Sequence, residues 1–190
     1  MLTVILAGGA SRRMGRDKAT LPCGDKTLLQ YQIDKYAILG PVAVSVNKSG
    51  KYAFTGAKEF PDRYPDCGPL NGLASAFAET DAAELFLTAV DLPHGEPELV
   101  RRLAALRGGA DVCILARGKK GVEPLFAVYG RECGAAAEVC LAAGNKSMFD
   151  LFDAVTVRCV LPEEVPGFDL ARILTNVNTP EDYQFFLEHR

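Results

Sequence analysis

The stretch LTVILAGGASRRMGRDKATL, residues 2–21, is the part of the sequence on which the interpretation of the whole chain rests. An apolar run ends in Gly8 and Gly9, a pattern typical of a buried strand that leads into a loop. Glycine lets backbone N–H groups come close to a ligand, and the loop also carries Arg12, Arg13 and Lys18. Backbone donors and cationic side chains together suit a polyphosphate, so the stretch predicts a phosphate-binding loop.

The spacing of this loop matches neither of the two common phosphate-binding fingerprints. Gly15 is followed by Arg16 instead of the Lys-Ser/Thr pair of a P-loop, and the three glycines do not form G-x-G-x-x-G. An ordinary strand-to-helix turn with solvated basic side chains therefore stays open as the alternative to phosphate binding.

The composition is that of one ordinary globular domain of 190 residues with a net charge of −3. This charge gives no reason to expect nucleic acid or an anionic membrane as a partner. No apolar run approaches the roughly 18 residues that span a bilayer, and no secretory leader is recognised, so we expect a cytoplasmic protein. The six cysteines and two histidines match no zinc spacing, which favours free, mostly buried thiols.

Apolar, strand-like segments alternate with segments of helical periodicity along the chain. The expected strands are 3–7, 41–46, 57–60, 84–90, 111–116, 124–129, 155–160 and a short extended piece at 173–177. The expected helices are 28–37, 70–77, 97–106, 131–143, 148–152 and one that begins at Pro180 after a threonine cap. The alternation predicts an α/β fold, a mostly parallel open sheet with helices on both faces.

Asp91 follows the most convincing central strand, 84–90. In open α/β sheets the ligand sits outside the carboxyl ends of the strands, so we expect Asp91 beside the glycine-containing loop. A carboxylate that faces a polyphosphate needs a cation between them, and Mg²⁺ prefers such oxygen ligands. Capping of the turn at Leu92-Pro93 is an equally open interpretation of Asp91.

Further polar residues gather in the loops at other points of the chain. Asp62 and Asp66 flank a proline- and glycine-rich loop and either accept hydrogen bonds from a base edge or are simply solvated. Arg117, Lys119 and Lys120 either receive an anionic second substrate or form a solvated charged turn. Asn176, Asn178 and Thr179 either present their side chains to a ligand or satisfy local backbone groups.

Several motifs resemble those of the molybdenum cofactor guanylyltransferases, a branch of the Rossmann-like nucleotidyltransferases. The motifs are LAGGASRRMGRDK (6–18), GPLNGL (68–73), DLP (91–93), EPLFA (123–127) and NVNTPED (176–182), in the family's order. The resemblance implies a single-domain, three-layer Rossmann-like nucleotidyltransferase fold over residues 1–190. It also implies a nucleotide-binding half at about 1–110 and an acceptor-binding half at about 111–190.

The activity implied by the resemblance is transfer of GMP from GTP to molybdopterin-bound molybdenum cofactor, with release of pyrophosphate and with Mg²⁺ as cofactor. Carried over by position, the nucleotide-binding residues are Leu6, Ala7, Gly8, Gly9, Gly15, Lys18, Asn47, Asp62, Gly68 and Asp91, with Ser45 as the alternative to Asn47. Arg13, Lys18 and Asp91 are the implied catalytic residues, and Asp91 is also the implied metal ligand. The implied acceptor contacts are Glu123, Pro124, Lys146, Asn176 and Asn178; Lys146 stands where the family often has arginine.

Two kinds of alternative function stay open at this point. One is a sister enzyme that uses CTP, or that transfers a nucleotide to a sugar phosphate. The other is a non-catalytic nucleotide-binding adaptor that passes cofactor to another protein. For the guanylyltransferase, transient contacts with cofactor-insertion proteins or apo-molybdoenzymes are expected, and neither nucleic acid nor membrane is.

Overall fold

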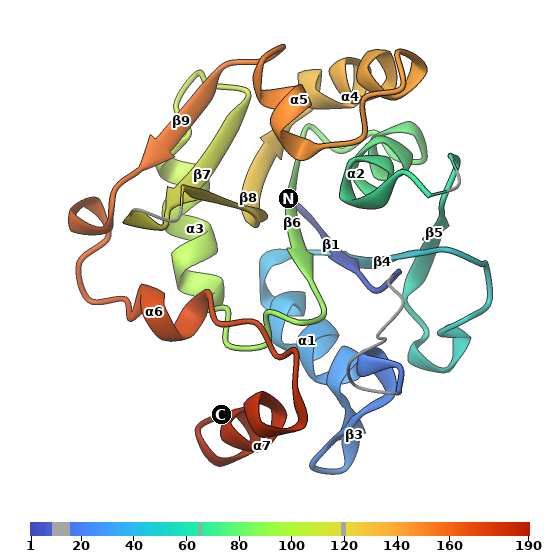
Figure 1. Ribbon diagram of the computed structural model, residues 1–190, viewed down its shortest axis with the longest axis vertical. Helices are drawn as coiled ribbons and strands as arrows, with labels where there is room; N and C mark the ends of the chain where they lie inside the picture. Colours follow the sequence, from blue (N-terminus) through green and yellow to red (C-terminus); the bar gives the residue numbers. More distant parts are fainter. Residues whose placement is uncertain (9–15, 65, 119–120) are drawn as a thin grey trace.

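A computed structural model of the chain describes residues 1–8, 16–64, 66–118 and 121–190 (Figure 1). The main element is a seven-stranded sheet with the order β5-β4-β1-β6-β8-β7-β9. The strands are β1 (Leu2–Leu6), β4 (Val42–Val46), β5 (Lys58–Pro61), β6 (Glu84–Ala89), β7 (Val112–Ala116), β8 (Val122–Gly130) and β9 (Val157–Val160). β8 runs antiparallel to both of its neighbours, and the other neighbouring pairs are parallel. The mostly parallel open sheet expected from the alternation of elements is confirmed.

Helices cover both faces of this sheet and complete a three-layer arrangement (Figure 1). Their bounds are α1 (Leu28–Tyr36), α2 (Gly68–Ala78), α3 (Pro97–Leu106), α4 (Glu132–Ala142), α5 (Met148–Phe152), α6 (Leu170–Ile173) and α7 (Pro180–Glu188). α1, α3, α6 and α7 pack into one buried apolar cluster, and α2, α4 and α5 pack into a second. Neighbouring strand residues point into opposite clusters, as period-two alternation requires: Ile5 belongs to the first and Val4 to the second.

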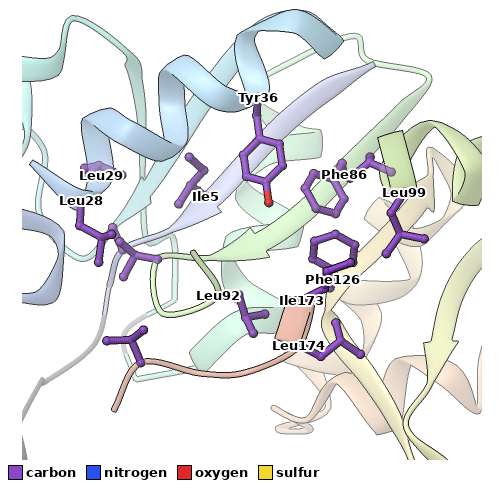
Figure 2. Packing of buried hydrophobic residues seen from close by; sticks show 14 of the residues in the cluster. Ile5, Leu28, Leu29, Tyr36, Phe86, Leu92, Leu99, Phe126, Ile173 and Leu174 are labelled. Atoms are coloured by element: carbon purple, nitrogen blue, oxygen red, sulfur yellow. The ribbon is translucent and has the colours of Figure 1, made fainter. Parts of the chain in front are cut away.

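Aromatic rings form the centre of the first cluster (Figure 2). The ring of Phe86 on β6 packs edge-on between Tyr36 of α1 and Phe126 of β8, at centroid separations of 5.2 and 4.9 Å. Such pairs add about 0.5–1.5 kcal/mol each to the free energy gained from burial. The contacts join β6 and β8 to the helical layer on this face of the sheet.

One expected element is wrong: residues 173–177 do not form an extended piece. Ile173 ends helix α6, which Asp169 caps by accepting a hydrogen bond from the Arg172 N–H at 3.1 Å. The segment that follows makes one bond to the β6 end, from the Val177 N–H to the Asp91 carbonyl at 2.8 Å, rather than a strand ladder. Ile173, Leu174 and Val177 are buried in the core from this turn, without the alternation of burial that a strand would show.

Two smaller differences concern the first half of the chain. A short hairpin of β2 (Pro22–Cys23) and β3 (Lys26–Thr27) precedes α1. Helix α2 begins at Gly68, two residues before the expected start, because Pro69 fits the first turn of a helix. None of the helices in the described ranges is long and apolar enough to cross a membrane.

The fold brings the carboxyl ends of β1 and β6 together. The two strands are direct parallel neighbours, with Leu6 opposite Ala89 at their ends. The loop after β1 and Asp91 after β6 therefore leave the sheet at the same edge. β8, from the expected acceptor half, lies between β6 and β7, so both halves contribute strands to one continuous sheet.

Candidate functional site

A cavity of about 670 Å³ lies at the carboxyl ends of β1, β4 and β6. Its lining residues are Leu6, Ala7, Gly8, Asp17, Lys18, Ser45, Asn47, Asp62, Asp66, Gly68, Pro69, Ala89, Val90, Asp91 and Leu125. The structure thus gathers the described residues of the expected nucleotide set in one place. Gly9 and Gly15 of that set, and Arg13 of the expected catalytic set, lie outside the described residues. A volume of this size falls in the range of small-molecule sites in proteins.

Lys18 lies at the centre of the polar groups of this cavity. It begins a short 3₁₀ helix, η1 (Lys18–Thr20), and its side chain is only 12% exposed. Its ammonium donates to Asn178 Oδ1 at 2.7 Å and lies 3.3 Å from Asp91 Oδ2. Three segments that are distant in the sequence therefore meet at one cation.

Asp91 has one carboxylate oxygen that the described residues leave without a partner. Oδ2 faces Lys18, whereas Oδ1 is buried and has no hydrogen-bond partner in the described part of the chain. The turn after β6 is closed by the backbone, from the Leu92 N–H to the Ala89 carbonyl at 3.0 Å. The carboxylate is thus available to the cavity instead of serving as the cap of the turn. A buried, unpartnered carboxylate oxygen is a group that a hard cation can satisfy.

Asn178 owes its position to the start of α7. The Asp182 carboxylate accepts hydrogen bonds from the Asn178 and Thr179 N–H groups, both at 2.9 Å. The Thr179 hydroxyl in turn accepts from the Asp182 N–H, which completes a capping box. The bonds from the backbone lower the pKa of Asp182, so its carboxylate stays charged in this role. The cap expected at Thr179-Pro180 therefore also places an amide oxygen against Lys18.

The opposite wall of the cavity is the loop that carries Asp62 and Asp66. The Arg63 and Tyr64 N–H groups both donate to Asn71 Oδ1 of α2, at 3.2 and 3.1 Å. Burial raises the pKa of Asp62, and the nearby Asp66 carboxylate adds to this shift. Asp66 has a φ of 57°, a left-handed conformation that is uncommon for a residue other than glycine. The loop thus holds two carboxylates in a defined arrangement at the cavity.

The same loop is also held from α4. Glu138 accepts hydrogen bonds from the Arg63 guanidinium and from the Tyr64 hydroxyl through its two carboxylate oxygens. The Lys146 ammonium reaches the Asp66 carbonyl at 3.4 Å. Lys146, expected among the acceptor contacts, therefore contacts a lining residue without being one itself.

Three other expected acceptor residues are also absent from the lining of the cavity. Glu123 is only 7% exposed and pairs with the Arg117 guanidinium, which also donates to the Leu174 carbonyl at 2.9 Å. The Pro124 carbonyl accepts from the Tyr129 hydroxyl at 2.8 Å. The lining residues that the structure describes include neither of these two nor Asn176, although they do include Leu125. Lys119 and Lys120 lie outside the described ranges.

Five lining residues were not among the expected site residues: Asp17, Pro69, Ala89, Val90 and Leu125. Asp17 stands next to Lys18 and accepts a hydrogen bond from the Ala19 N–H at 3.1 Å, so it caps η1. An aspartate before a short helical turn is a recognisable cap signal. Ser45 and Asn47, the two alternatives for the nucleotide contact near the end of the second expected strand, both line the cavity.

Residues 3–158 match the family model described as a MobA-like NTP transferase domain. The chain belongs to the MobA-like NTP transferase family. A relative from Carboxydothermus hydrogenoformans, named probable molybdenum cofactor guanylyltransferase, is 34% identical over 98% of this chain and 95% of its own length. A relative of the same name from Methanosarcina mazei is 31% identical over 98% of this chain and 89% of its own length.

Solved structures of other MobA-like and nucleotidyltransferase chains share the fold. The molybdopterin-guanine dinucleotide biosynthesis protein A from Archaeoglobus fulgidus superposes with a TM-score of 0.84 at 22% identity, covering 100% of this chain and 98% of that chain. A nucleotidyl transferase from Methanothermobacter superposes with a TM-score of 0.76 at 20% identity, covering 99% of this chain and 96% of that chain. These likenesses show that the MobA-like chain has the expected Rossmann-like nucleotidyltransferase fold.

Proposed function

We propose that this protein transfers GMP from GTP to the molybdenum cofactor and releases pyrophosphate. The observation that carries the proposal is the meeting of Lys18 and Asp91 at 3.3 Å in a cavity formed by the loops after β1 and β6. Membership of the MobA-like family supports nucleotidyl transfer, and the names of its relatives support guanylyl transfer to this cofactor.

The reaction is an in-line substitution at phosphorus. A terminal phosphate oxygen of molybdopterin attacks the α-phosphorus of GTP and forms a new P–O bond. The bond from the α-phosphorus to the oxygen that bridges to the β-phosphate breaks, and its electron pair leaves with pyrophosphate. The attacking phosphate is already anionic, so neither a general base nor a covalent intermediate with the protein is required. Catalysis then consists of positioning and charge neutralisation.

Lys18 is the residue to which we assign the charge on the leaving pyrophosphate. Its ammonium is largely buried, so its interaction with phosphate oxygens is weakly screened by water. Arg13 and the N–H groups after β1, together with Gly9 and Gly15, belong to the same proposed phosphate site. Leu6, Ala7 and Gly8 would contact the nucleotide beside them.

Asp91 is the residue to which we assign the proposed Mg²⁺. The fit of Asp91 to Mg²⁺ rests on its buried Oδ1, which has no hydrogen-bond partner among the described residues. Those residues contain no group of three or more histidine, cysteine, aspartate or glutamate side chains that could hold a metal alone. Mg²⁺ is commonly held by one or two carboxylates together with substrate phosphates, which agrees with such a site. When bound, the ion supplies positive charge at the phosphates.

The guanine base is assigned to the wall that carries Asp62, with Asn47 and Gly68 beside it. A carboxylate accepts hydrogen bonds from guanine N1–H and N2–H₂, which cytosine and uracil do not present in that arrangement. Lys146, Asn176 and Asn178, together with Glu123 and Pro124, are the proposed acceptor side. Transient contact with a cofactor-insertion protein or an apo-molybdoenzyme belongs to the same proposal.

The deciding experiment measures pyrophosphate release from GTP by the purified protein, with Mg²⁺ and purified molybdenum cofactor. We expect release with GTP and little with CTP or UTP, and a loss of about 10²–10³ in rate for Lys18→Ala and for Asp91→Ala. Lys26→Ala is the matched control, because Lys26 is a surface lysine paired with Asp34. Binding of GTP without pyrophosphate release would favour the adaptor, and equal rates with CTP would contradict the assignment of the base.

A further inference from the structure

Tyr52 is a buried side chain whose hydroxyl lies between the two ends of the loop after β1. The side chain is 0% exposed. Its hydroxyl oxygen lies 3.0 Å from the Ala7 carbonyl oxygen and 2.8 Å from Asp17 Oδ2. Ala7 follows β1 and Asp17 precedes η1, so one hydroxyl contacts the residues on either side of the proposed phosphate site.

The edge strand β5 holds Tyr52 in this place. Glu59 of β5 accepts a hydrogen bond from the Tyr52 N–H at 2.5 Å and another from the Gly50 N–H. The ring of Phe54 packs edge-on against the Tyr52 ring at 6.2 Å. These contacts fix both the backbone and the ring, so the position of the hydroxyl is determined from outside the cavity.

Asp17 connects the Tyr52 hydroxyl to the turn that begins at Lys18. Its Oδ1 caps η1 by accepting from the Ala19 N–H, while Oδ2 accepts from the Tyr52 hydroxyl and lies 3.0 Å from the Lys51 ammonium. Burial raises the pKa of Tyr52, and the bond to Asp17 raises it further, so the hydroxyl keeps its proton and can donate it. Lys18 is the first residue of the capped turn, and the direction of the turn sets where its side chain starts.

We infer that Tyr52 is a positioning residue for GTP, which acts through Asp17 to hold Lys18 at the phosphate site of the cavity. The inference rests on the proposed function, because it takes Lys18 to contact the triphosphate. Neither Tyr52 nor its hydroxyl reacts. The residue lies in a loop, 47–56, of which Asn47 alone is among the expected site residues.

The test compares Tyr52→Phe, which keeps the ring and removes the hydroxyl, with Tyr36→Phe. Tyr36 is the matched control, since it is a fully buried tyrosine of the same apolar cluster and lies away from the cavity lining. We expect Tyr52→Phe to raise the Kd and KM for GTP about three- to tenfold, the effect of one hydrogen bond, and to leave the KM for molybdenum cofactor unchanged. Tyr36→Phe should leave both KM values unchanged.

If Tyr52 served stability alone, Tyr52→Phe would lower the Tm. It would not raise the KM for GTP selectively over the KM for molybdenum cofactor. An unchanged GTP Kd and KM in Tyr52→Phe, or equal changes for both substrates, would overturn the inference. Asp17→Asn retains an acceptor for the Tyr52 hydroxyl. It should therefore retain most of the GTP affinity that Asp17→Ala loses. In the Asp17→Ala background, Tyr52→Phe should weaken GTP binding little further. Additive effects of the two substitutions on the Kd for GTP would contradict a role of Tyr52 through Asp17.

The Kd for GTP, measured by calorimetry, separates failure of this inference from failure of the proposed function. GTP binding without turnover in the unmodified protein would refute guanylyl transfer, and the Kd of Tyr52→Phe would still decide the positioning role. Absence of any GTP binding would overturn both.

Discussion

Replacement of Gly72 by alanine tests how closely α2 must approach the sheet behind the nucleotide site. A Cβ at this position would lie 2.5 Å from Leu6 Cδ2, 2.7 Å from Ser45 Oγ and 3.3 Å from Ser45 Cβ. Leu6 and Ser45 both line the cavity, and Ser45 is buried on β4. The added methyl group can therefore be accommodated only if these side chains rotate or if α2 moves away from β1 and β4.

The expected cost follows from this overlap. Overpacking of a dense interior typically costs about 1–3 kcal/mol. For a chain of this size each kcal/mol lowers the Tm by roughly 2–4 °C, so we expect the Tm of Gly72→Ala to fall by about 2–12 °C. Because the displaced side chains line the cavity, we also expect a rise of about fivefold or more in the KM for GTP, which corresponds to roughly 1 kcal/mol of binding free energy.

The assay is a thermal melt together with GTP saturation kinetics, and Gly109→Ala is the matched control. A Cβ at Gly109 meets nothing within 4 Å, and its φ is not in the left-handed region. That variant should be neutral or slightly stabilised, by about 0.4–1 kcal/mol, because alanine restricts the unfolded chain. The reasoning fails if Gly72→Ala retains both the Tm and the GTP KM of the parent protein.

Three further predictions concern single side chains. Asn178→Ala removes the group that accepts a hydrogen bond from the Lys18 ammonium at 2.7 Å, so kcat/KM for GTP should fall about five- to tenfold. A kcat/KM equal to that of the parent protein would contradict this prediction. Glu138→Gln weakens the contacts that hold the Asp62 loop, so the KM for GTP should rise several-fold. The unfolding free energy should change by less than about 1 kcal/mol, as for an exposed ion pair. Glu132→Gln on the same helix should change neither the KM nor the unfolding free energy. Burial lowers the pKa of Lys35 from 10.5 to about 7, so the unfolded chain binds the proton more strongly and stability rises with pH between about 7 and 10.5. Lys35→Met should flatten that rise in a series of Tm against pH, and an equally steep rise in the variant would refute the assignment.

The order of elements could be predicted because most of them leave a strong local pattern. Residues 84–90 are apolar almost throughout, as a strand buried on both faces must be, and β6 lies in the middle of the sheet. The wrong element, 173–177, has its apolar residues at spacings that a turn on the core satisfies as well as a strand does. The hairpin before α1 is two residues long on each side, too short to show a period.

The cavity could be predicted in part, because glycines and charges at the ends of two strands meet wherever those strands are neighbours. Lys18 and Asp91 are 73 positions apart, and only the pairing of β1 with β6 brings them together. The contact of Tyr52 with Asp17 leaves no comparable signal, since it depends on how an irregular loop folds back from β5.

The contacts of Lys18 and Arg117 bear on how an anionic acceptor reaches the nucleotide. Arg117 was a candidate to receive it, but its guanidinium pairs with the buried Glu123 and donates to the Leu174 carbonyl. Recruitment of Arg117 would break both interactions and leave the Glu123 carboxylate buried without its partner, which is costly. Asn178, by contrast, already touches Lys18 at the cavity. We therefore expect the acceptor phosphate to approach along the segment before α7, where an expected acceptor contact and the proposed phosphate-binding lysine share one hydrogen bond.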